Sequence, residues 1–250
     1  MAKLGTENGA SLKGRSGLLE NLLQLLFPER CLLCRSLLKT VSDRPLCPKC
    51  DHIALPVGVV CPHCGAYGNK NSSPCGCRQN GYALQGLFAL SFYEGRWRIL
   101  LHNLKYRGRL SLARPLGRWL ARELMLQGCF IPQIVVPVPL HYSRERERGF
   151  NQSALLARQV AKELHIPFSE LLIRNRETES QTKISRRERL LNVRGAFSCR
   201  SELKAGAQIL LIDDIFSTGA TLKEAAYCLQ CRGALVYGAV VAYNPLRQNC

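Results

Sequence analysis

The feature that most constrains this 250-residue chain is the stretch at residues 209–221, which reads ILLIDDIFSTGAT. Its leading aliphatic residues predict a strand buried on both faces, as in a parallel sheet. Asp213 and Asp214 come where this apolar run stops, and Ser-Thr-Gly-Ala-Thr then leads into the helical pattern of residues 222–229. Unpaired backbone N–H groups at a helix start can bind a phosphate, and a glycine lets the chain approach it closely.

The two carboxylates of this stretch need partners of their own, because they would repel a phosphate beside them. Vicinal sugar hydroxyls or a divalent cation would serve. The stretch therefore predicts a site for a ribose 5-phosphate. Taken singly, Asp at a strand end and Ser or Thr at a helix start are common turn and cap residues. The complete order of strand, acidic pair, hydroxyl and glycine turn, and helix is far more specific.

This order resembles the phosphoribosyl pyrophosphate (PRPP) signature of type I phosphoribosyltransferases. The resemblance implies that Asp213 and Asp214 hold the ribose hydroxyls. It also implies that the 5-phosphate is wrapped by the turn that follows them, made of Ser217, Thr218, Gly219, Ala220 and Thr221.

Composition and charge limit the class of protein. With 46% hydrophobic and 21% charged residues the chain is typical of soluble globular proteins, and no apolar run approaches the roughly 20 residues that span a bilayer. Residues 1–17 carry no pattern of a secretory signal and are expected to be a disordered leader. We therefore expect a cytoplasmic protein without membrane insertion. A leucine stripe at residues 18–26 predicts a core-packing helix.

The net charge of +17 is concentrated in the middle of the chain. Residues 81–200 hold 21 Lys and Arg against 9 Asp and Glu, whereas residues 201–250 hold 4 of each kind. This excess favours an anionic partner: a polyphosphate substrate, a nucleic acid, or both. A solvated basic surface is the alternative for part of it.

The cysteines follow metal-site spacing. Eight of the 13 fall between residues 31 and 77 in four close pairs, and two such pairs complete a tetrahedral zinc site. We expect two structural zinc ions, bound either sequentially or in a cross-braced arrangement, by Cys31, Cys34, Cys47, Cys50, Cys61, Cys64, Cys75 and Cys77. Cys228 and Cys231 also form a Cys-x-x-Cys pair, but in a helical pattern, and are interpreted as buried small apolar residues.

From residue 81 onward, strand and helix patterns alternate, which predicts an α/β fold with a parallel sheet flanked by helices and ligands at the strand C-termini. Strands are expected at residues 81–92, 134–140, 171–173, 209–212 and 236–241, and helices at 97–104, 112–126 and 153–164. Lys105 and Tyr106 lie in a basic loop after the first helix. That loop could contact substrate or cap the helix.

A second anion-binding turn is expected between the VPVPL strand and the helix at 153–164. It contains Arg148, Gly149, Asn151 and Gln152. The cysteine pairs, LKYRG, VPVPL, RERGFNQS at residues 146–153 and the PRPP signature occur in an order that resembles the ComF family. Its members carry a cysteine-rich zinc module before a type I phosphoribosyltransferase domain. The resemblance implies a module at 18–80 and a phosphoribosyltransferase-like domain at 81–250.

The polar, Arg-rich segment at residues 174–197 could be a solvated connector. In type I phosphoribosyltransferases a mobile loop at this point closes over the site and binds pyrophosphate. The resemblance therefore assigns to the pyrophosphate contacts Arg174, Arg176, Thr178, Gln181 and Arg189, together with Arg148.

Two functions follow from the resemblance. One is an enzyme that uses PRPP with Mg²⁺, in which Asp213, Asp214, Arg148 and Arg176 carry the chemistry and the acceptor is open. The other is a non-catalytic protein that senses PRPP or a nucleotide, or binds single-stranded DNA with the DNA-uptake machinery. The oligomeric state is open.

Overall fold

The computed structural model describes residues 29–38, 45–51, 56–68, 75, 77, 83–128, 132–176 and 192–245. The chain forms two units, residues 1–52 and residues 53–250. The expected leader and the expected helix at 18–26 lie outside the described residues. Among the described helices, none is long and apolar enough to cross a membrane.

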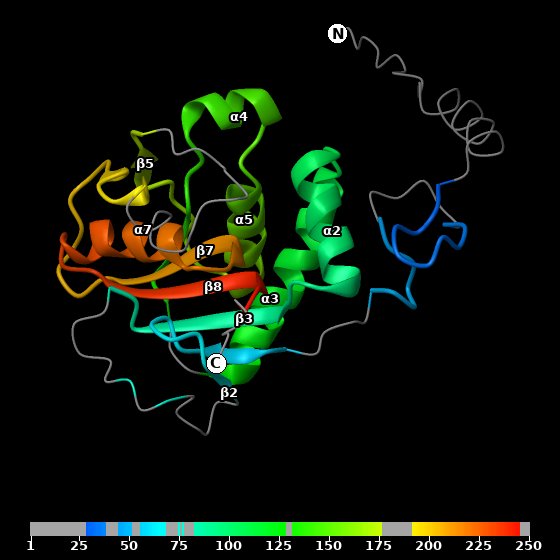
Figure 1. Cartoon of the computed structure of the whole chain (residues 1–250), viewed down its shortest axis with the longest axis horizontal. Coiled ribbons are helices and arrows are strands. Elements are labelled where there is room, and N and C mark those ends of the chain that lie inside the picture. Colours follow the sequence, from blue (N-terminus) through cyan, green and yellow to red (C-terminus); the bar gives the residue numbers. More distant parts are fainter. Residues whose placement is uncertain are drawn as a thin grey trace, which may run out of the picture. The chain divides into compact units, whose positions relative to one another are not determined.

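The larger unit is built on a six-stranded sheet with the strand order β2-β1-β3-β8-β7-β4 (Figure 1). Four neighbouring strands run parallel: β3 (Gly86–Phe92), β8 (Leu235–Tyr243), β7 (Gln208–Phe216) and β4 (Ile134–Pro137). Two short antiparallel strands extend the β3 edge: β1 (Gly58–Val60) and β2 (Tyr67–Gly68). The predicted α/β class with a parallel sheet is confirmed.

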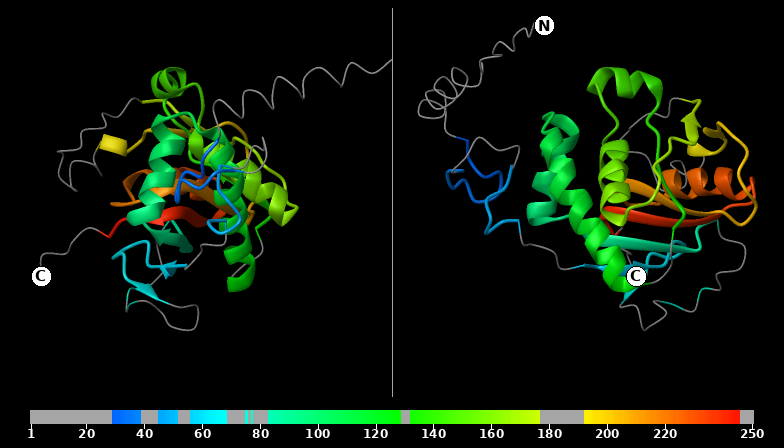
Figure 2. Two further views of the ribbon diagram at one scale, coloured as in Figure 1. Left: turned by 90° about the vertical axis from the view of Figure 1, so that its right-hand side faces the viewer. Right: turned by 180° about the vertical axis from the view of Figure 1, so that it is seen from behind.

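Helices cover both faces of this sheet. Helix α7 (Ala220–Gln230) packs on one face, while α3 (Ala113–Gln127) and α5 (Gln152–Leu164) lie on the other, as the view from behind in Figure 2 shows. Helix α2 (Gly95–Tyr106) follows β3, and the short α4 (Tyr142–Arg148) follows β4. A 3-10 turn at Leu110–Leu112 leads into α3.

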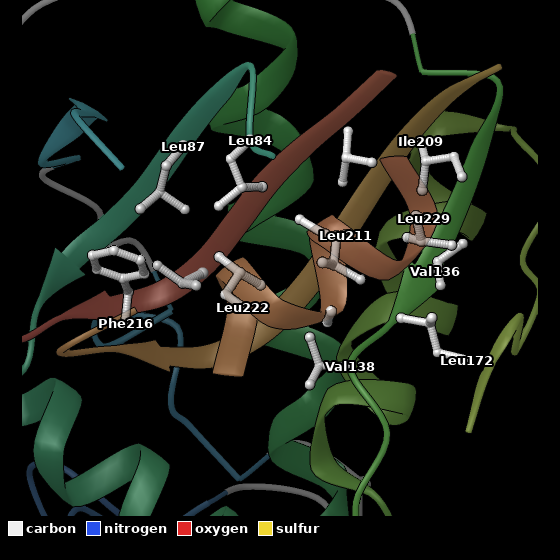
Figure 3. Packing of buried hydrophobic residues seen from close by; sticks show 14 of the residues in the cluster. Leu84, Leu87, Val136, Val138, Leu172, Ile209, Leu211, Phe216, Leu222 and Leu229 are labelled. Carbon is white, nitrogen blue, oxygen red and sulfur yellow. The ribbon is translucent and has the colours of Figure 1, made fainter. Parts of the chain in front are cut away.

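Strand β7 is buried on both faces, as its aliphatic run predicts. Ile209 and Leu211 pack against Leu222 and Leu229 of α7 (Figure 3). Because side chains alternate along a strand, Leu210 points to the opposite face, and it is fully buried as well. The core thus fixes β7 from both sides and with it the position of its C-terminal end.

The structure extends some elements beyond the expected limits. Strand β7 continues through the acidic pair to Phe216, because parallel pairing with β8 holds as far as Tyr243. Part of the expected turn at 143–152 is helical, since a His141 ring nitrogen caps α4 by accepting from the Ser143 N–H. Strand β5 (Leu172–Arg174) pairs antiparallel with β6 (Phe197–Cys199) in a separate sheet.

Candidate functional site

Three elements meet at the acidic pair near the end of β7. Ser153, in the first turn of α5, donates its hydroxyl to Asp213 Oδ1 at 2.8 Å, and the Asp214 N–H donates to the same oxygen at 2.9 Å. Lys105, from the last turn of α2, places Nζ 2.7 Å from Asp214 Oδ2. Lys105 therefore belongs to a helix end rather than to the expected loop, and it supplies a cation to the acidic pair, of which Asp214 is buried and Asp213 half-buried.

Burial and charge raise the pKa of Asp213 to about 7, with desolvation the larger cause and the neighbouring Asp214 the second. Lys105 and the Ser153 hydroxyl act in the opposite direction. The pKa of Lys105 is raised, because attraction to Asp214 outweighs the burial that opposes its charge. Two carboxylates thus share one ammonium group, and further hydroxyl donors or a cation would stabilise both in the ionised form.

A cavity of about 590 Å³ opens beside the acidic pair. Its size is that of a small-molecule site. Besides the pair, its charged and polar lining consists of Lys105, Tyr106, Arg144, Glu147, Arg148, Gln152, Ser153, Arg174 and Thr221. Four cations and three carboxylates thus line the cavity, a combination that suits a ligand with both anionic groups and hydroxyl groups.

Arg148 is oriented toward this cavity by two neighbours. Its Nη1 donates to Gln152 Oε1 at 3.2 Å, and its guanidinium carbon lies 5.3 Å from the centre of the Tyr106 ring. Gly149, with φ of 78°, ends α4 directly after it. The Arg174 guanidinium lies 5.6 Å from the Phe197 ring, and burial followed by the nearby Arg144 lowers its pKa.

Asn151 and Gln152 have different surroundings. Asn151 caps α5: its Oδ1 accepts from the Ser153 and Ala154 N–H groups, and its Nδ2 donates to the Val138 carbonyl at 3.1 Å. The Gln152 side chain lines the cavity. Of the two amides expected to meet an anion, the Asn151 side chain thus bonds to the protein backbone.

The hydroxyl loop, residues 217–221, lies between two cavities. Thr221 lines the cavity beside the acidic pair, whereas Ser217 and Thr218 line a second one of about 540 Å³. Thr218 Oγ1 accepts from the Ala220 N–H at 3.3 Å. Gly219 adopts a left-handed conformation with φ of 73°, immediately before α7 begins at Ala220. The sequence predicted the loop and the helix start, but not that Thr221 would line one cavity while Ser217 and Thr218 line the other.

The Arg-rich segment is described only at its two ends. Arg176 Nη2 donates to the carbonyls of Asn192 and Arg194, at 2.8 and 3.2 Å. It thereby joins residues on both sides of 177–191, and it is not among the residues that line the two cavities described above. Thr178, Gln181 and Arg189 lie outside the described residues.

Sequence reasoning missed Ser153 and Arg144. Assigning residues 142–148 to a helix would have placed Arg144 and Arg148 on one face, since residues four apart are neighbours there. Nothing in the sequence signals that Ser153 turns toward Asp213, because that contact depends on how α5 packs on β7.

The eight cysteines form two clusters in sequential order. Cys31, Cys34, Cys47 and Cys50 make the first, in the smaller unit, and Cys61, Cys64, Cys75 and Cys77 make the second. In each cluster all sulfur atoms lie within 4.8 Å of one another. Of the two arrangements left open by the sequence, the structure has the sequential one.

The geometry and charge of these clusters fit zinc. Cys34 and Cys47 Sγ lie 3.5 Å apart, close to the separation of about 3.8 Å that tetrahedral zinc–sulfur bonds require. A hydrogen bond with Ser36 lowers the pKa of Cys34 to about 6. Burial, followed by contact with Cys34, raises the pKa of Cys50 to about 12. Four neighbouring thiols thus resist joint ionisation, and a divalent cation would remove that resistance.

The interpretation of Cys228 and Cys231 as buried residues is wrong for one of them. Cys228, in α7, is half-buried and packs against the hydrophobic core, but Cys231 is exposed at the end of that helix. The two thiols differ because α7 ends at Gln230: Cys228 lies within the helix, whereas Cys231 is the cap residue that follows its last turn.

The parallel sheet, with an acidic pair and a hydroxyl loop at the C-terminal end of one strand, is the arrangement of a phosphoribosyltransferase domain. The family described as "Phosphoribosyl transferase domain" matches residues 151–249. DNA utilization protein YhgH of Escherichia coli O157:H7 is 34% identical over 217 residues, covering 84% of this chain and 94% of that protein. Competence protein ComFC of Bacillus subtilis is 32% identical over 213 residues, covering 84% and 82%.

The chain belongs to the ComF family of proteins with a phosphoribosyltransferase domain. Among solved structures, adenine phosphoribosyltransferase from Leishmania tarentolae aligns with 66% of this chain and 79% of its own, at 16% identity and a TM-score of 0.39.

Elemental analysis of the purified protein should find about two zinc ions per chain, since each cluster supplies four sulfur ligands. Replacing one cysteine in either cluster, as in Cys47→Ser or Cys61→Ser, should reduce the content to about one. A content of about one in the unmodified chain would contradict the two-site interpretation.

The raised pKa of Asp213 predicts how stability varies with pH. Folded Asp213 holds its proton up to about pH 7, while the unfolded residue releases it near 3.8. Stability conferred by the protonated form is therefore lost as the pH rises across that window. Without ligand, Asp213→Asn should melt about 3 °C above the unmodified chain at pH 8 and at nearly the same temperature at pH 4.

The control for this measurement is Glu170→Gln, which removes a carboxyl from the exposed pair with Arg158. Its melting temperature should follow that of the unmodified chain at both pH values, because exposed pairs contribute little. A lower melting temperature for Asp213→Asn at pH 8 would show that the ionised carboxyl stabilises the fold.

Proposed function

We propose that this protein binds PRPP together with Mg²⁺ in the cavity beside Asp213 and Asp214. The observation that carries the proposal is the carboxylate pair, half-buried Asp213 and buried Asp214, held between Lys105 and Ser153 near the end of a parallel strand. Ribose hydroxyls would supply donors to these carboxylates, which share one ammonium group. Membership of the ComF family, whose relatives share the phosphoribosyltransferase domain, also supports PRPP as the ligand.

The other residues of the site would contact the phosphate groups of PRPP. Arg148 and Arg174, which line the cavity, would contact the pyrophosphate. The hydroxyl loop at residues 217–221, which reaches this cavity at Thr221, would wrap the 5-phosphate. The remaining contacts to the pyrophosphate are proposed to come from Gly149, Gln152, Arg176, Thr178, Gln181 and Arg189. Tyr106 orients Arg148.

A Mg²⁺ ion bound together with PRPP would neutralise negative charge on the departing pyrophosphate. The oxygen-rich acidic pair suits such a hard cation. The chain's own contribution would be positioning: Lys105 and Ser153 hold the carboxylates, and the arginines hold the leaving group in line.

We further propose that the binding serves DNA uptake or nucleotide metabolism in the cytoplasm, a compartment reducing enough to keep zinc thiolates intact. The names "DNA utilization protein" and "Competence protein" belong to relatives and support this context. The alternative is a non-catalytic PRPP or nucleotide sensor, or a single-stranded-DNA-binding component, favoured by the net charge of +17.

The double variant Asp213→Asn, Asp214→Asn should weaken PRPP binding at least about 100-fold, since it removes two charged acceptors of the ribose hydroxyls. Calorimetry with Mg²⁺ measures this, and the zinc content should stay at about two. The matched control is Glu170→Gln, outside the cavity, which should bind as the unmodified chain does. Unchanged affinity in the double variant would reject the site.

Turnover is tested by pyrophosphate release from PRPP across a panel of purine and pyrimidine bases and amines. The transferase proposal expects release that depends on both Mg²⁺ and one acceptor class, and that the double variant abolishes. Tight PRPP binding without release for any acceptor would favour the sensing or DNA-binding alternative.

A further inference from the structure

The second cysteine cluster and the hydroxyl loop are neighbours in space. The cavity of about 540 Å³ is bounded on one side by residues 63–67, which turn around Cys64, and on the other by residues 216–218. Tyr243, the last residue of β8, lies at the same cavity. We term the segment at residues 61–67 the knuckle.

The knuckle rests on Tyr243. The Tyr243 hydroxyl donates to the Gly65 carbonyl at 2.6 Å, and the Gly65 N–H donates to the Cys61 carbonyl at 2.9 Å within the turn. Gly65 has φ of 78°, and a Cβ at this position would lie 2.6 Å from the Tyr243 hydroxyl oxygen. The contact is therefore too close for any side chain at residue 65.

The hydroxyl loop rests on Phe216 in a similar way. A Cβ at Gly219, which has φ of 73°, would lie 2.4 Å from a carbon of the Phe216 ring. The Phe216 and Tyr243 rings have centroids 6.0 Å apart, and the Asn244 N–H donates to the Phe216 carbonyl at 2.8 Å. One aromatic pair thus contacts a left-handed glycine in each of the two loops.

We propose that Tyr243 and Phe216 are positioning residues that couple the second zinc cluster to the hydroxyl loop. Zinc fixes the knuckle, the Gly65 carbonyl fixes the Tyr243 hydroxyl, and the packed rings fix the backbone of residues 217–221. Because coupling between two sites is reciprocal, phosphate bound at the loop retains zinc, and zinc strengthens phosphate binding. The phosphate part rests on the proposed function.

A purely structural role for the aromatic pair makes a different prediction. Core packing alone would lower the melting temperature without making zinc release depend on PRPP. The measurements must therefore report the local opening of residues 216–221 and the rate of zinc release, in addition to the melting temperature.

The first measurement is hydrogen–deuterium exchange of the full chain without ligand. Tyr243→Phe removes the hydroxyl bonded to Gly65 and keeps the ring, and it should speed exchange in residues 216–221 about fivefold, as the loss of one hydrogen bond predicts. The matched control is Tyr237→Phe, a hydroxyl deletion earlier in β8, which should leave this exchange unchanged. Equal exchange in Tyr243→Phe and the unmodified chain would overturn the proposal.

The second measurement is zinc release to a chelator, with and without PRPP and Mg²⁺. PRPP should slow release of one of the two zinc ions in the unmodified chain, and Tyr243→Phe should reduce that effect about fivefold. Cys61→Ser should bind PRPP more weakly, whereas Cys47→Ser, in the other unit, should lose a zinc ion without losing affinity. Release that PRPP binding leaves unchanged would overturn the coupling.

The two proposals fail in distinguishable ways. No calorimetric heat with PRPP in the unmodified chain would overturn the proposed function. The exchange measurement needs no ligand, so it still decides whether the knuckle holds the loop.

Discussion

The acidic pair near the end of β7, with Asp214 buried and Asp213 half-buried, is the constraint on which the candidate site depends. Ionised carboxylates are costly to bury unless donors surround them. Here the donors come from separate elements: the ammonium group of Lys105 from α2, and the hydroxyl of Ser153 from α5. Helix α5 packs on β4 and β7, and α2 buries Leu100, Leu101 and Leu104. The site thus depends on the tertiary fold. A change in helix packing would move Lys105 or Ser153 away from the carboxylates and leave their charge less well compensated.

The sequence was most informative where one local pattern decides the structure. The aliphatic run before Asp213 predicted a strand buried on both faces, and the hydroxyl and glycine turn before the helical pattern of residues 222–229 predicted a helix start. The sequence could not show which residues satisfy the acidic pair, because Lys105 and Ser153 are remote from it along the chain. It also could not show that Asn151 is used as a cap, since a cap and an anion ligand have the same sequence signal.

The cysteine clusters show the same division between local and long-range information. Each Cys-x-x-Cys turn is local, so the ligands were predictable from spacing. The pairing of the turns depends on the path of the chain. The Leu32 N–H donates to the Pro45 carbonyl at 3.1 Å, which brings the segment around Cys47 onto the turn at Cys31. That backbone contact has no signature in the sequence.

The two short strands beside the second cluster also have a protective consequence. Strand β1 pairs along β3, which lies at one end of the four parallel strands, and so occupies backbone groups that would otherwise lie at an open edge. Unpaired sheet edges are templates for association with other chains. On this side the sheet therefore ends on β2, a strand of two residues, and so short an edge offers another chain little backbone to pair with.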